Sequence, residues 1–477
     1  MVRNYNRRFP VLLILCIILA ITSMGQQEYR VNFKIQGLKD TTCLIAYYYG
    51  KSTYVEDTLS IDGSGQCRFH SRPNLPKGMY ILILPGKAHF DFILNNDSKF
   101  SMETNLSDPV KHMKIKYSKE NSLFYQYLWF TREQHEQTLL WSSLQKQVQG
   151  QPDSVRVLQQ EVDRISRAVA AYKTDLTINN PDAFISFLIN ILNEPDIHLV
   201  KDNDKGNNDS VFQYFFYATH YLDPIDLTDS RLLRTPVFEM KLEHYLSKVV
   251  FPVPDSILVS CAILLEKARP NQEVYRYVLW YLTRYYENSE IMGFDKVFVS
   301  LVDNYYMNGH SPWVDTNLNK ALIEKANRLR PLLIGTKAPN LIMQDTSLNL
   351  VSMHEVASNY LLLLFWDPDC GHCKVETEKV QTFYNSEGGS YGLKVFAVCT
   401  DTNFVKMKKA IKDRQLNWIN VNGPRTLTGN FHDQYDIIQT PVLYLLNDKK
   451  EIVAKRFPAD QLGTILKYDT LRRLGSQ

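Results

Sequence analysis

The sequence has few cysteines, no long apolar segment and no block of like charge. Only seven of its 477 residues are cysteines, and one of these, Cys16, lies in an apolar N-terminal stretch. Small secreted scaffolds that depend on disulfides have a far denser cysteine framework, so hydrophobic cores must stabilise this chain. The formal net charge of +3 is too small to indicate nucleic acid or an anionic surface as a partner.

The N-terminus has the pattern of an export signal. Three arginines precede an apolar run at Val11–Ile21, which is too short to cross a bilayer as a helix. Ser23 and Gly25 are small residues suited to a cleavage site, so residues 1–25 are predicted to be a signal peptide and Gln26 to begin the mature chain. The protein is therefore expected in the periplasm or cell envelope, without stable membrane insertion. The alternative is an inner-membrane anchor formed by an uncleaved signal.

Hydrophobic periodicity divides the rest of the chain into three zones. Residues 26–110 alternate apolar and polar positions, which predicts an antiparallel all-β module with a hairpin turn at Asp62–Gly65. Residues 115–331 show helical spacing and predict an all-α domain. Its aromatic run at Phe212–Tyr221 is expected to lie in the core, although it could instead line a groove. Residues 332–477 alternate strand and helix, which predicts an α/β domain with a mixed sheet covered on both faces.

The chemistry is concentrated in the stretch LLLLFWDPDCGHCK at Leu361–Lys374. An apolar run of strand length ends in a CxxC pair, and a helical pattern follows. Cys370 should therefore lie at a helix N-terminus, where unpaired N–H groups and the helix dipole favour a thiolate. We expect Cys370 to be the exposed nucleophile and Cys373, one turn further, to be the buried resolving thiol. Apart from a redox-active disulfide between these two, no cofactor is expected.

Neighbouring residues should set the redox potential of the pair. His372, which follows Gly371 between the cysteines, can stabilise the Cys370 thiolate and make the disulfide easier to reduce. Asp367 and Asp369 would act in the opposite direction, since nearby carboxylates raise the pKa of a thiol. We expect a reduction potential of roughly −270 to −120 mV.

Other roles for cysteine remain open. A structural zinc site needs four ligands, yet the sequence has no second CxxC and no HExxH pattern, so no metal site is expected. The CxxC pair could instead be a structural disulfide, or belong to a redox-inactive domain that binds peptides. Cys43 and Cys67 lie in strand-like runs, where they either pair with each other or stay as buried thiols.

A family resemblance extends these inferences. Phe365-Trp366, Cys370–Lys374 and Thr440-Pro441 together resemble the thioredoxin superfamily. The stretch Ile334–Asp345 and Glu376 resemble its TlpA-like, AhpC/TSA-related envelope branch. The upstream zones resemble the DUF4369-like β module and DUF5106-like helical domain of Gram-negative envelope proteins. The resemblance implies a C-terminal thioredoxin fold that exchanges disulfides with protein or peptide thiols, together with an unidentified redox partner.

The resemblance also implies residue roles. Pro441 would be a cis-proline facing the cysteines, and the Thr440 backbone would pair with a substrate peptide. Trp366 joins Gly371 and His372 as a residue expected to tune the pair. Glu376 would be the proton acceptor.

Several positions depart from the family patterns. Leu364 occupies the place of thioredoxin's buried acid, and Thr377 occurs where the envelope branch often has proline. Asp367 stands where peroxidase relatives need threonine, which argues against peroxide reduction.

Two function classes follow from the sequence. One is an envelope thiol–disulfide oxidoreductase whose upstream domains recruit substrates. The other is a non-catalytic binding or scaffold protein whose thioredoxin-like domain docks peptides. The intact CGHC, Glu376 and Thr440-Pro441 favour the first class.

Overall fold

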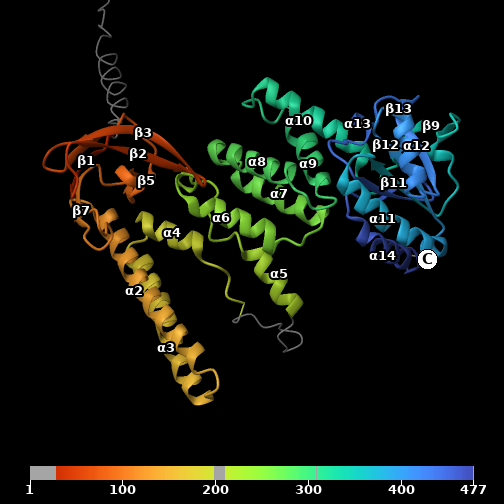
Figure 1. The fold of residues 1–477 in the computed structure, drawn as a ribbon. Helices are drawn as coiled ribbons and strands as arrows, with labels where there is room; N and C mark the ends of the chain where they lie inside the picture. Colours follow the sequence, from red (N-terminus) through yellow and green to blue (C-terminus); the bar gives the residue numbers. More distant parts are fainter. Residues whose placement is uncertain (1–27, 198–209, 308, 476–477) are drawn as a thin grey trace, which may run out of the picture. The chain divides into compact units, whose positions relative to one another are not determined.

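The computed structural model describes residues 28–197, 210–307 and 309–475 (Figure 1). These residues form two compact units. One contains the described residues up to Val250 together with Lys267–Tyr275, and the other contains Phe251–Glu266 and the chain from Arg276 onwards. The predicted signal peptide, residues 1–25, lies outside the described residues. The division into three domains stays a prediction.

The first unit starts with a β sandwich of two four-stranded sheets, ordered β4-β1-β7-β8 and β3-β2-β5-β6. All strand pairs are antiparallel except β1 with β7, so the prediction of a wholly antiparallel module is wrong at this pair. A parallel pair needs a long connection, and here the whole second sheet lies between the two strands in sequence. The strands are β1 (Arg30–Gln36), β2 (Thr41–Tyr49), β3 (Ser52–Ile61), β4 (Gln66–His70), β5 (Gly78–Ile83), β6 (His89–Leu94), β7 (Lys99–Asn105) and β8 (Lys114–Lys116).

The alternating sequence pattern produces the core of this sandwich. In β1 every second residue is buried, and Val31, Phe33 and Ile35 are each 1% exposed. Because side chains in a strand alternate between the two faces, the apolar set points between the sheets and the polar set points outwards. Cys67 and Phe69 of β4 follow the same rule.

The Asp62–Gly65 stretch forms the expected turn, but not a hairpin within one sheet. The Asp62 carboxylate accepts hydrogen bonds from the backbone N–H groups of Ser64 and Gln66, and Gly65 has a φ of 80°. The strands that the turn connects, β3 and β4, belong to different sheets. Periodicity predicts the two strands and the turn, but it does not show which strands become neighbours.

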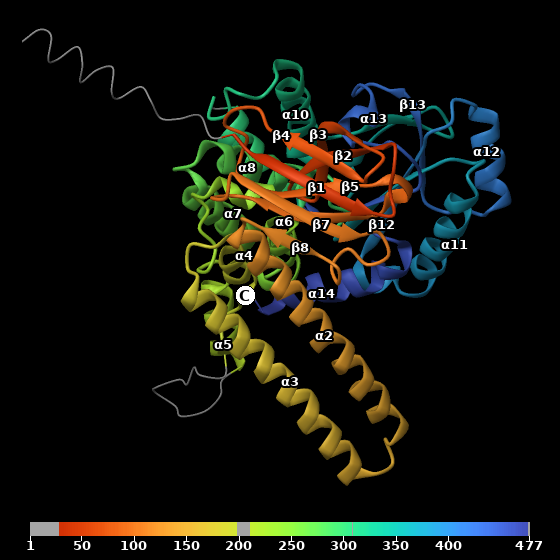
Figure 2. The ribbon, with the colours of Figure 1, turned by 90° about the vertical axis from the view of Figure 1, so that its left-hand side faces the viewer.

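Helices complete the first unit. The long helices α2 and α3 lie side by side as an antiparallel hairpin that projects from the sandwich, as both ribbon views show (Figure 2). Ser118 caps α2 by accepting a hydrogen bond from the Asn121 N–H, and the rings of Phe130 and Tyr172 stack between the two helices. The helices of this unit are α2 (Lys119–Gln147), α3 (Pro152–Asn179), α4 (Phe184–Leu192), α5 (Ser210–His220) and α6 (Pro236–His244).

The aromatic run in α5 is not part of the core. None of the side chains of this helix is buried, and Phe215 is 62% exposed. Only Tyr221, which follows the helix, is fully buried. The expectation that Phe212–Tyr221 packs inside is therefore wrong for the helix, because aromatic spacing alone does not show whether another element covers that face.

The second unit joins further helices to a seven-stranded sheet ordered β10-β9-β13-β12-β11-β14-β15. Its strands are β9 (Ile342–Asp345), β10 (Leu350–Ser352), β11 (Tyr360–Trp366), β12 (Leu393–Cys399), β13 (Ile419–Thr426), β14 (Val442–Asn447) and β15 (Ile452–Lys455). Its helices are α7 (Pro254–Ala268) and α8 (Gln272–Glu287), both crossed by the unit boundary, and α9 (Asp295–Leu301), α10 (Thr316–Leu329), α11 (Gly371–Ser386), α12 (Phe404–Asp413), α13 (Phe431–Gln434) and α14 (Leu462–Gly475).

The central strand β11 explains the apolar run LLLLFW. All seven of its residues are buried, and they alternate between two cores. Leu362, Leu364 and Trp366 pack in the core that contains Cys373, whereas Leu363 and Phe365 pack in the core on the opposite face. β11 is parallel to β12 and antiparallel to β14, which confirms the predicted mixed sheet covered on both faces.

A buried ion pair connects the edge strand of this sheet to α9. Lys455 of β15, whose side chain is 6% exposed, pairs with Asp295 and donates a hydrogen bond to the Leu332 carbonyl. Burial lowers the pKa of Lys455, and the Asp295 carboxylate opposes that effect. The ion pair therefore connects the helical segment to the sheet. Without Asp295, the Lys455 charge would be buried and unpaired.

Candidate active site

The chain places Cys370 at the junction of strand and helix. β11 ends at Trp366, and Cys370 adopts an extended backbone conformation as the N-cap of α11. Its sulfur accepts a hydrogen bond from the Cys373 N–H at 3.1 Å. This N–H is one of the unpaired donors at the start of a helix, and such donors stabilise a negative charge.

These contacts make Cys370 the more acidic of the two thiols. Its partial burial opposes ionisation, but hydrogen bonds from the Cys373 side chain and backbone and from Thr440 outweigh that effect and lower the pKa of Cys370. None of the strongest influences on this thiol is a carboxylate, so the predicted opposition by Asp367 and Asp369 is not a main influence here. Cys370 is also partly exposed, as a nucleophile must be.

Cys373 has the opposite environment. Its side chain is fully buried in the core that contains Leu364 and Trp366. Burial, with the hydrogen bond to Cys370, raises the pKa of Cys373 to about 11. Both cysteines are free thiols in this structure. The geometry thus fits the predicted roles of an accessible first thiol and a buried second one.

The strand register brings a proline to the cysteines. β14 pairs antiparallel with β11 so that Val442 lies opposite Phe365. The start of β14 therefore meets the end of β11, and the Thr440-Pro441 peptide, which is cis, lies beside Cys370. The Thr440 carbonyl is 3.5 Å from the Cys370 sulfur. The fold thus brings Cys370 and Cys373 next to Thr440 and Pro441, although the two motifs are some 70 positions apart in the chain.

A groove of about 770 Å³ runs beside this peptide. Its walls include His372, Glu376, Thr440 and Pro441. Ile438, which also lines the groove, is 87% exposed. The groove is therefore one accessible surface that contains the predicted tuning residue His372, the predicted proton acceptor and the predicted substrate-binding residues. The exposed Ile438 side chain adds an apolar contact surface to it.

Glu376 lies in this groove with both carboxylate oxygens engaged. One accepts a hydrogen bond from Lys379 Nζ at 2.7 Å, and the other accepts one from the Ala459 N–H at 2.6 Å. The side chain is 16% exposed. The Thr377 hydroxyl donates a hydrogen bond to the Cys373 carbonyl, and α11 continues without interruption.

The other predicted tuning residues surround the pair. His372 and Gly371 are both exposed, and a Cβ at Gly371 would meet no atom within 4 Å. Trp366 is fully buried behind the cysteines, with the Arg414 guanidinium 5.6 Å from its ring centroid. Of the three, only His372 combines a titratable side chain with exposure in the groove.

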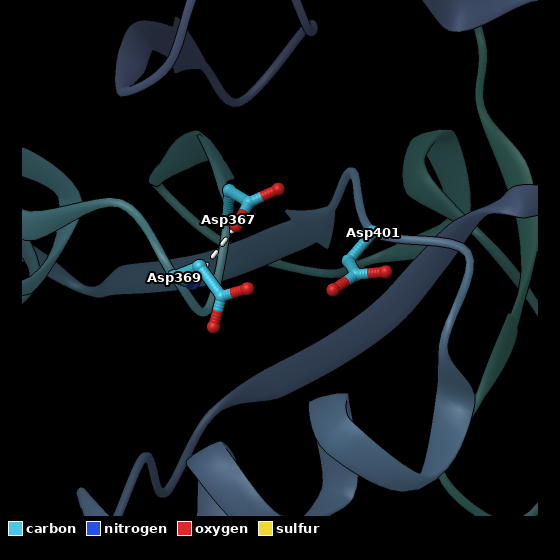
Figure 3. A group of neighbouring side chains, drawn as sticks. All are labelled: Asp367, Asp369 and Asp401. Atoms are coloured by element: carbon cyan, nitrogen blue, oxygen red, sulfur yellow. Dashed lines mark hydrogen bonds between the residues drawn. The ribbon is translucent and has the colours of Figure 1, made fainter.

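Three carboxylates cluster just beyond the C-terminal ends of β11 and β12. Asp367, Asp369 and Asp401 place oxygen atoms within 4.8 Å of one another, and Asp369 donates its backbone N–H to Asp367 (Figure 3). Lys406 forms ion pairs with Asp369 and Asp401 and thus supplies the positive charge that the cluster needs. The Asp401 pKa is lowered by a backbone hydrogen bond from Asn403 and by Lys406.

Sequence reasoning missed the groove residue Ile438, the Lys379 and Ala459 groups that hold Glu376, and Arg414 beside Trp366. None of the four is part of a recognisable motif. Ile438 precedes Thr440 by two positions, so its place next to the cis-proline was the one signal available in the sequence.

Comparisons with known proteins support the architecture. Residues 334–455 match the model of the AhpC/TSA family. A solved domain of a possible thiol-disulfide isomerase from Cytophaga hutchinsonii is 34% identical, and the match covers 31% of this chain and 99% of that one, with a TM-score of 0.29. The chain belongs to this thioredoxin-like family. The C-terminal α/β part of the chain thus has the fold and family of thiol–disulfide oxidoreductases.

Three further matches cover other parts or larger shares of the chain. Residues 208–328 match DUF5106, a domain of unknown function, as the resemblance predicted. The thioredoxin domain of a thiol-disulfide oxidoreductase from Bacteroides vulgatus is 27% identical over 30% of this chain and 96% of that one, with a TM-score of 0.25. A thioredoxin-like protein from Bacteroides caccae is 18% identical over 58% of this chain and 98% of that one, with a TM-score of 0.45. Because these TM-scores are below 0.5, the superpositions carry no argument of their own. No curated protein matches the chain.

Within residues 28–197, 210–307 and 309–475, no helix has both the length and the apolar character that crossing a bilayer requires.

Proposed function

We propose that this protein is an exported thiol–disulfide oxidoreductase that exchanges disulfides with protein or peptide substrates through Cys370 and Cys373. The observation that supports it most is the difference between the two thiols. Cys370 is partly exposed and has a lowered pKa, whereas Cys373 is fully buried and has a raised one. An attacking thiol must be reachable as a thiolate, while a resolving thiol needs to reach only the sulfur beside it.

The reaction proceeds in two exchange steps. The Cys370 thiolate attacks one sulfur of a substrate disulfide, forms a mixed disulfide and releases the other substrate sulfur as a thiolate. Cys373 then loses its proton and attacks the Cys370 sulfur. This step forms the Cys370–Cys373 disulfide, releases the second substrate thiol and leaves the substrate reduced by two electrons. The steps run in reverse when the substrate is to be oxidised, and the redox partner decides the direction.

Thr440 and Pro441 supply the substrate-binding edge. An extended peptide that pairs with the Thr440 backbone would lie along the groove next to the Cys370 sulfur. Ile438, exposed beside this edge, offers an apolar contact to a neighbouring substrate side chain. Backbone pairing accepts many sequences, so the groove suits a range of protein substrates.

We assign the proton of Cys373 to Glu376. The fully buried thiol must ionise in an apolar core, and Leu364 in the same core cannot accept a proton. Glu376 follows Cys373 by one helical turn, which places the two side chains on the same face of α11. Lys379 and the Ala459 N–H fix the carboxylate in position, and it could accept the proton directly or through one water.

The setting of this activity is part of the proposal. The N-terminal sequence supports export, so we place the protein in the periplasm or cell envelope, where substrates and an unidentified redox partner carry thiols or disulfides. His372 would keep the reduction potential within the expected range of roughly −270 to −120 mV.

Insulin reduction by the full chain in the presence of dithiothreitol tests the proposal. We expect the wild type to accelerate precipitation of the insulin B chain, and Cys370→Ser to reduce the rate to background. Cys261→Ala removes a buried cysteine of the same unit and should leave the rate unchanged. If the wild type does not exceed background yet retains peptides in the groove, the non-catalytic binding function is the correct one.

A further inference from the structure

A second pair of cysteines lies in the β sandwich of the first unit. Cys43 belongs to β2 and Cys67 to β4, and these strands are in different sheets. The two sulfurs are 3.7 Å apart in the space between the sheets. Both residues are buried, with exposures of 2% and 3%.

We propose that Cys43 and Cys67 are a disulfide-forming site that links the two sheets of the β module. A disulfide bond is about 2.0 Å long, so the two sulfurs must approach by less than 2 Å. Their strands already fix the positions, since Cys43 lies opposite Leu59 of β3 and Cys67 lies opposite Phe33 of β1. A small side-chain rotation supplies the remaining movement without any change of register.

The surroundings favour a disulfide over the other uses of two thiols. Phe33, Leu59 and Phe69 belong to the same apolar cluster as the pair, which suits an uncharged disulfide. A metal would need further ligands, and among the described residues the one group of three or more possible ligands is the acidic cluster at Asp367. In the folded module the hydrogen bond with Cys67 lowers the pKa of Cys43, and burial opposes this effect.

The site needs an oxidant, which we identify as a disulfide compound such as oxidised glutathione or a protein disulfide. The Cys43 thiolate attacks one sulfur of the oxidant, forms a mixed disulfide and releases a thiol. Cys67 then attacks the Cys43 sulfur, which forms the Cys43–Cys67 bond and releases the second thiol. The two cysteines lose two electrons and two protons, and the oxidant becomes two thiols.

Burial determines when this exchange takes place. An external disulfide cannot reach sulfurs that are only 2% and 3% exposed in the folded sandwich. The bond therefore forms while the module is still folding. Once the sandwich has closed, reductants are excluded for the same reason. The link needs no activity of Cys370 and Cys373, so it stands independently of the proposed function.

Disulfide mapping of the full chain tests this inference. The protein is reduced and unfolded, then refolded in a glutathione buffer that fully oxidises Cys370–Cys373, and alkylated, digested and analysed by mass spectrometry. We expect a peptide that links Cys43 to Cys67 in near-stoichiometric yield. The link should survive dithiothreitol treatment that reduces the CGHC pair in the native protein, and should disappear only in denaturant.

Controls keep the test decisive. Cys261→Ala removes a lone buried cysteine of the other unit and should leave the Cys43–Cys67 peptide unchanged. The mapping uses the wild type, so it does not depend on whether variants fold. Recovery of Cys43 and Cys67 as free alkylated thiols beside a fully oxidised CGHC pair would overturn the proposal. If dithiothreitol reduced the Cys43–Cys67 disulfide as fast as the CGHC disulfide, the inference that burial protects it would also be wrong.

Discussion

Cys370 and Cys373 stand three residues apart at the start of α11, whereas Cys43 and Cys67 face each other from two sheets. In the first pair one sulfur is partly exposed and the other is buried, and their pKa values are shifted in opposite directions from the ordinary value. In the second pair the pKa of Cys43 is lowered as well, but both sulfurs are buried between apolar strands, so the pairs differ in access. Exchange with other molecules requires access and one acidic thiol, while a lasting link requires only proximity and burial. The two pairs thus meet opposite requirements within one chain.

Removal of the resolving thiol should have the largest effect. Cys373→Ala leaves the attacking Cys370 intact, so mixed disulfides with substrate should accumulate to nearly one per protein, as non-reducing electrophoresis would show. Cys370→Ala is the matched control. Of the two cysteines it leaves only the buried Cys373, which a substrate disulfide cannot reach, and it should trap nothing. Equal trapping by both variants would contradict the asymmetry.

The next largest effect concerns Glu376. Glu376→Gln preserves the shape of the side chain but removes the base, so attack by Cys370 should be nearly unchanged and resolution should slow by about 10²-fold, the lower end for a general base. Rapid-quench kinetics separates the two steps. Glu378→Gln, an exposed change on the same helix, is the control and should alter neither step. Slowed attack with normal resolution would reverse the assignment.

The pH dependence of alkylation measures the acidity of Cys370. Iodoacetamide reacts with the thiolate, so a lowered pKa shifts the midpoint of the rate profile to a pH below that of an ordinary cysteine, about 8.5. The reaction should therefore continue at pH values where a free cysteine has nearly stopped reacting. Cys373, which is fully buried and has a pKa of about 11, should contribute little at neutral pH.

Variants of the Gly371-His372 dipeptide between the two cysteines test what lowers this midpoint. If His372 stabilises the thiolate, His372→Ala should raise the midpoint, while Gly371→Ala, which meets no atom within 4 Å, should leave it in place. An unchanged midpoint in His372→Ala would show that the His372 side chain does not stabilise the thiolate, and that the hydrogen bonds from Cys373 and Thr440 account for the lowered pKa.

The smallest expected effect belongs to the second pair. Cys43→Ala combined with Cys67→Ala should leave insulin reduction within about twofold of the wild type, since neither thiol is accessible for exchange. The assay is performed at a temperature where circular dichroism shows both proteins folded. A large loss of activity in the folded variant would mean that the pair takes part in electron transfer, and the contrast between the two pairs would fail.

The positions of the candidate active-site residues were predictable because these residues lie in two compact motifs. Cys370, Cys373, Thr440 and Pro441 meet as expected because a strand followed by a helix, and a strand preceded by proline, leave little freedom in the register of β11 and β14. Glu376 was placed correctly on α11, but its partners Lys379 and Ala459 are tertiary contacts that no motif contains.

Outside the active site, the sequence predicted which segments are strands or helices, but not which of them lie next to one another. The apolar run of β11 indicates burial on both faces, and the structure confirms it. The parallel pairing of β1 with β7 and the separation of β3 from β4 depend on the order of strands across the sandwich, which local periodicity does not encode. The exposed face of α5 likewise depends on which elements lie nearby.

The Lys455–Asp295 pair limits how the catalytic sheet could be grafted into another protein. A graft that begins at residue 332, where the α/β pattern starts, would carry the buried lysine but leave its carboxylate behind. An unpartnered buried charge typically costs about 3–5 kcal/mol, so such a graft should unfold at lower denaturant than one that begins before α9, as paired urea titrations would show. A stable graft must therefore be longer than the segment with the thioredoxin-like pattern, and it must begin upstream of α9, within the helical region.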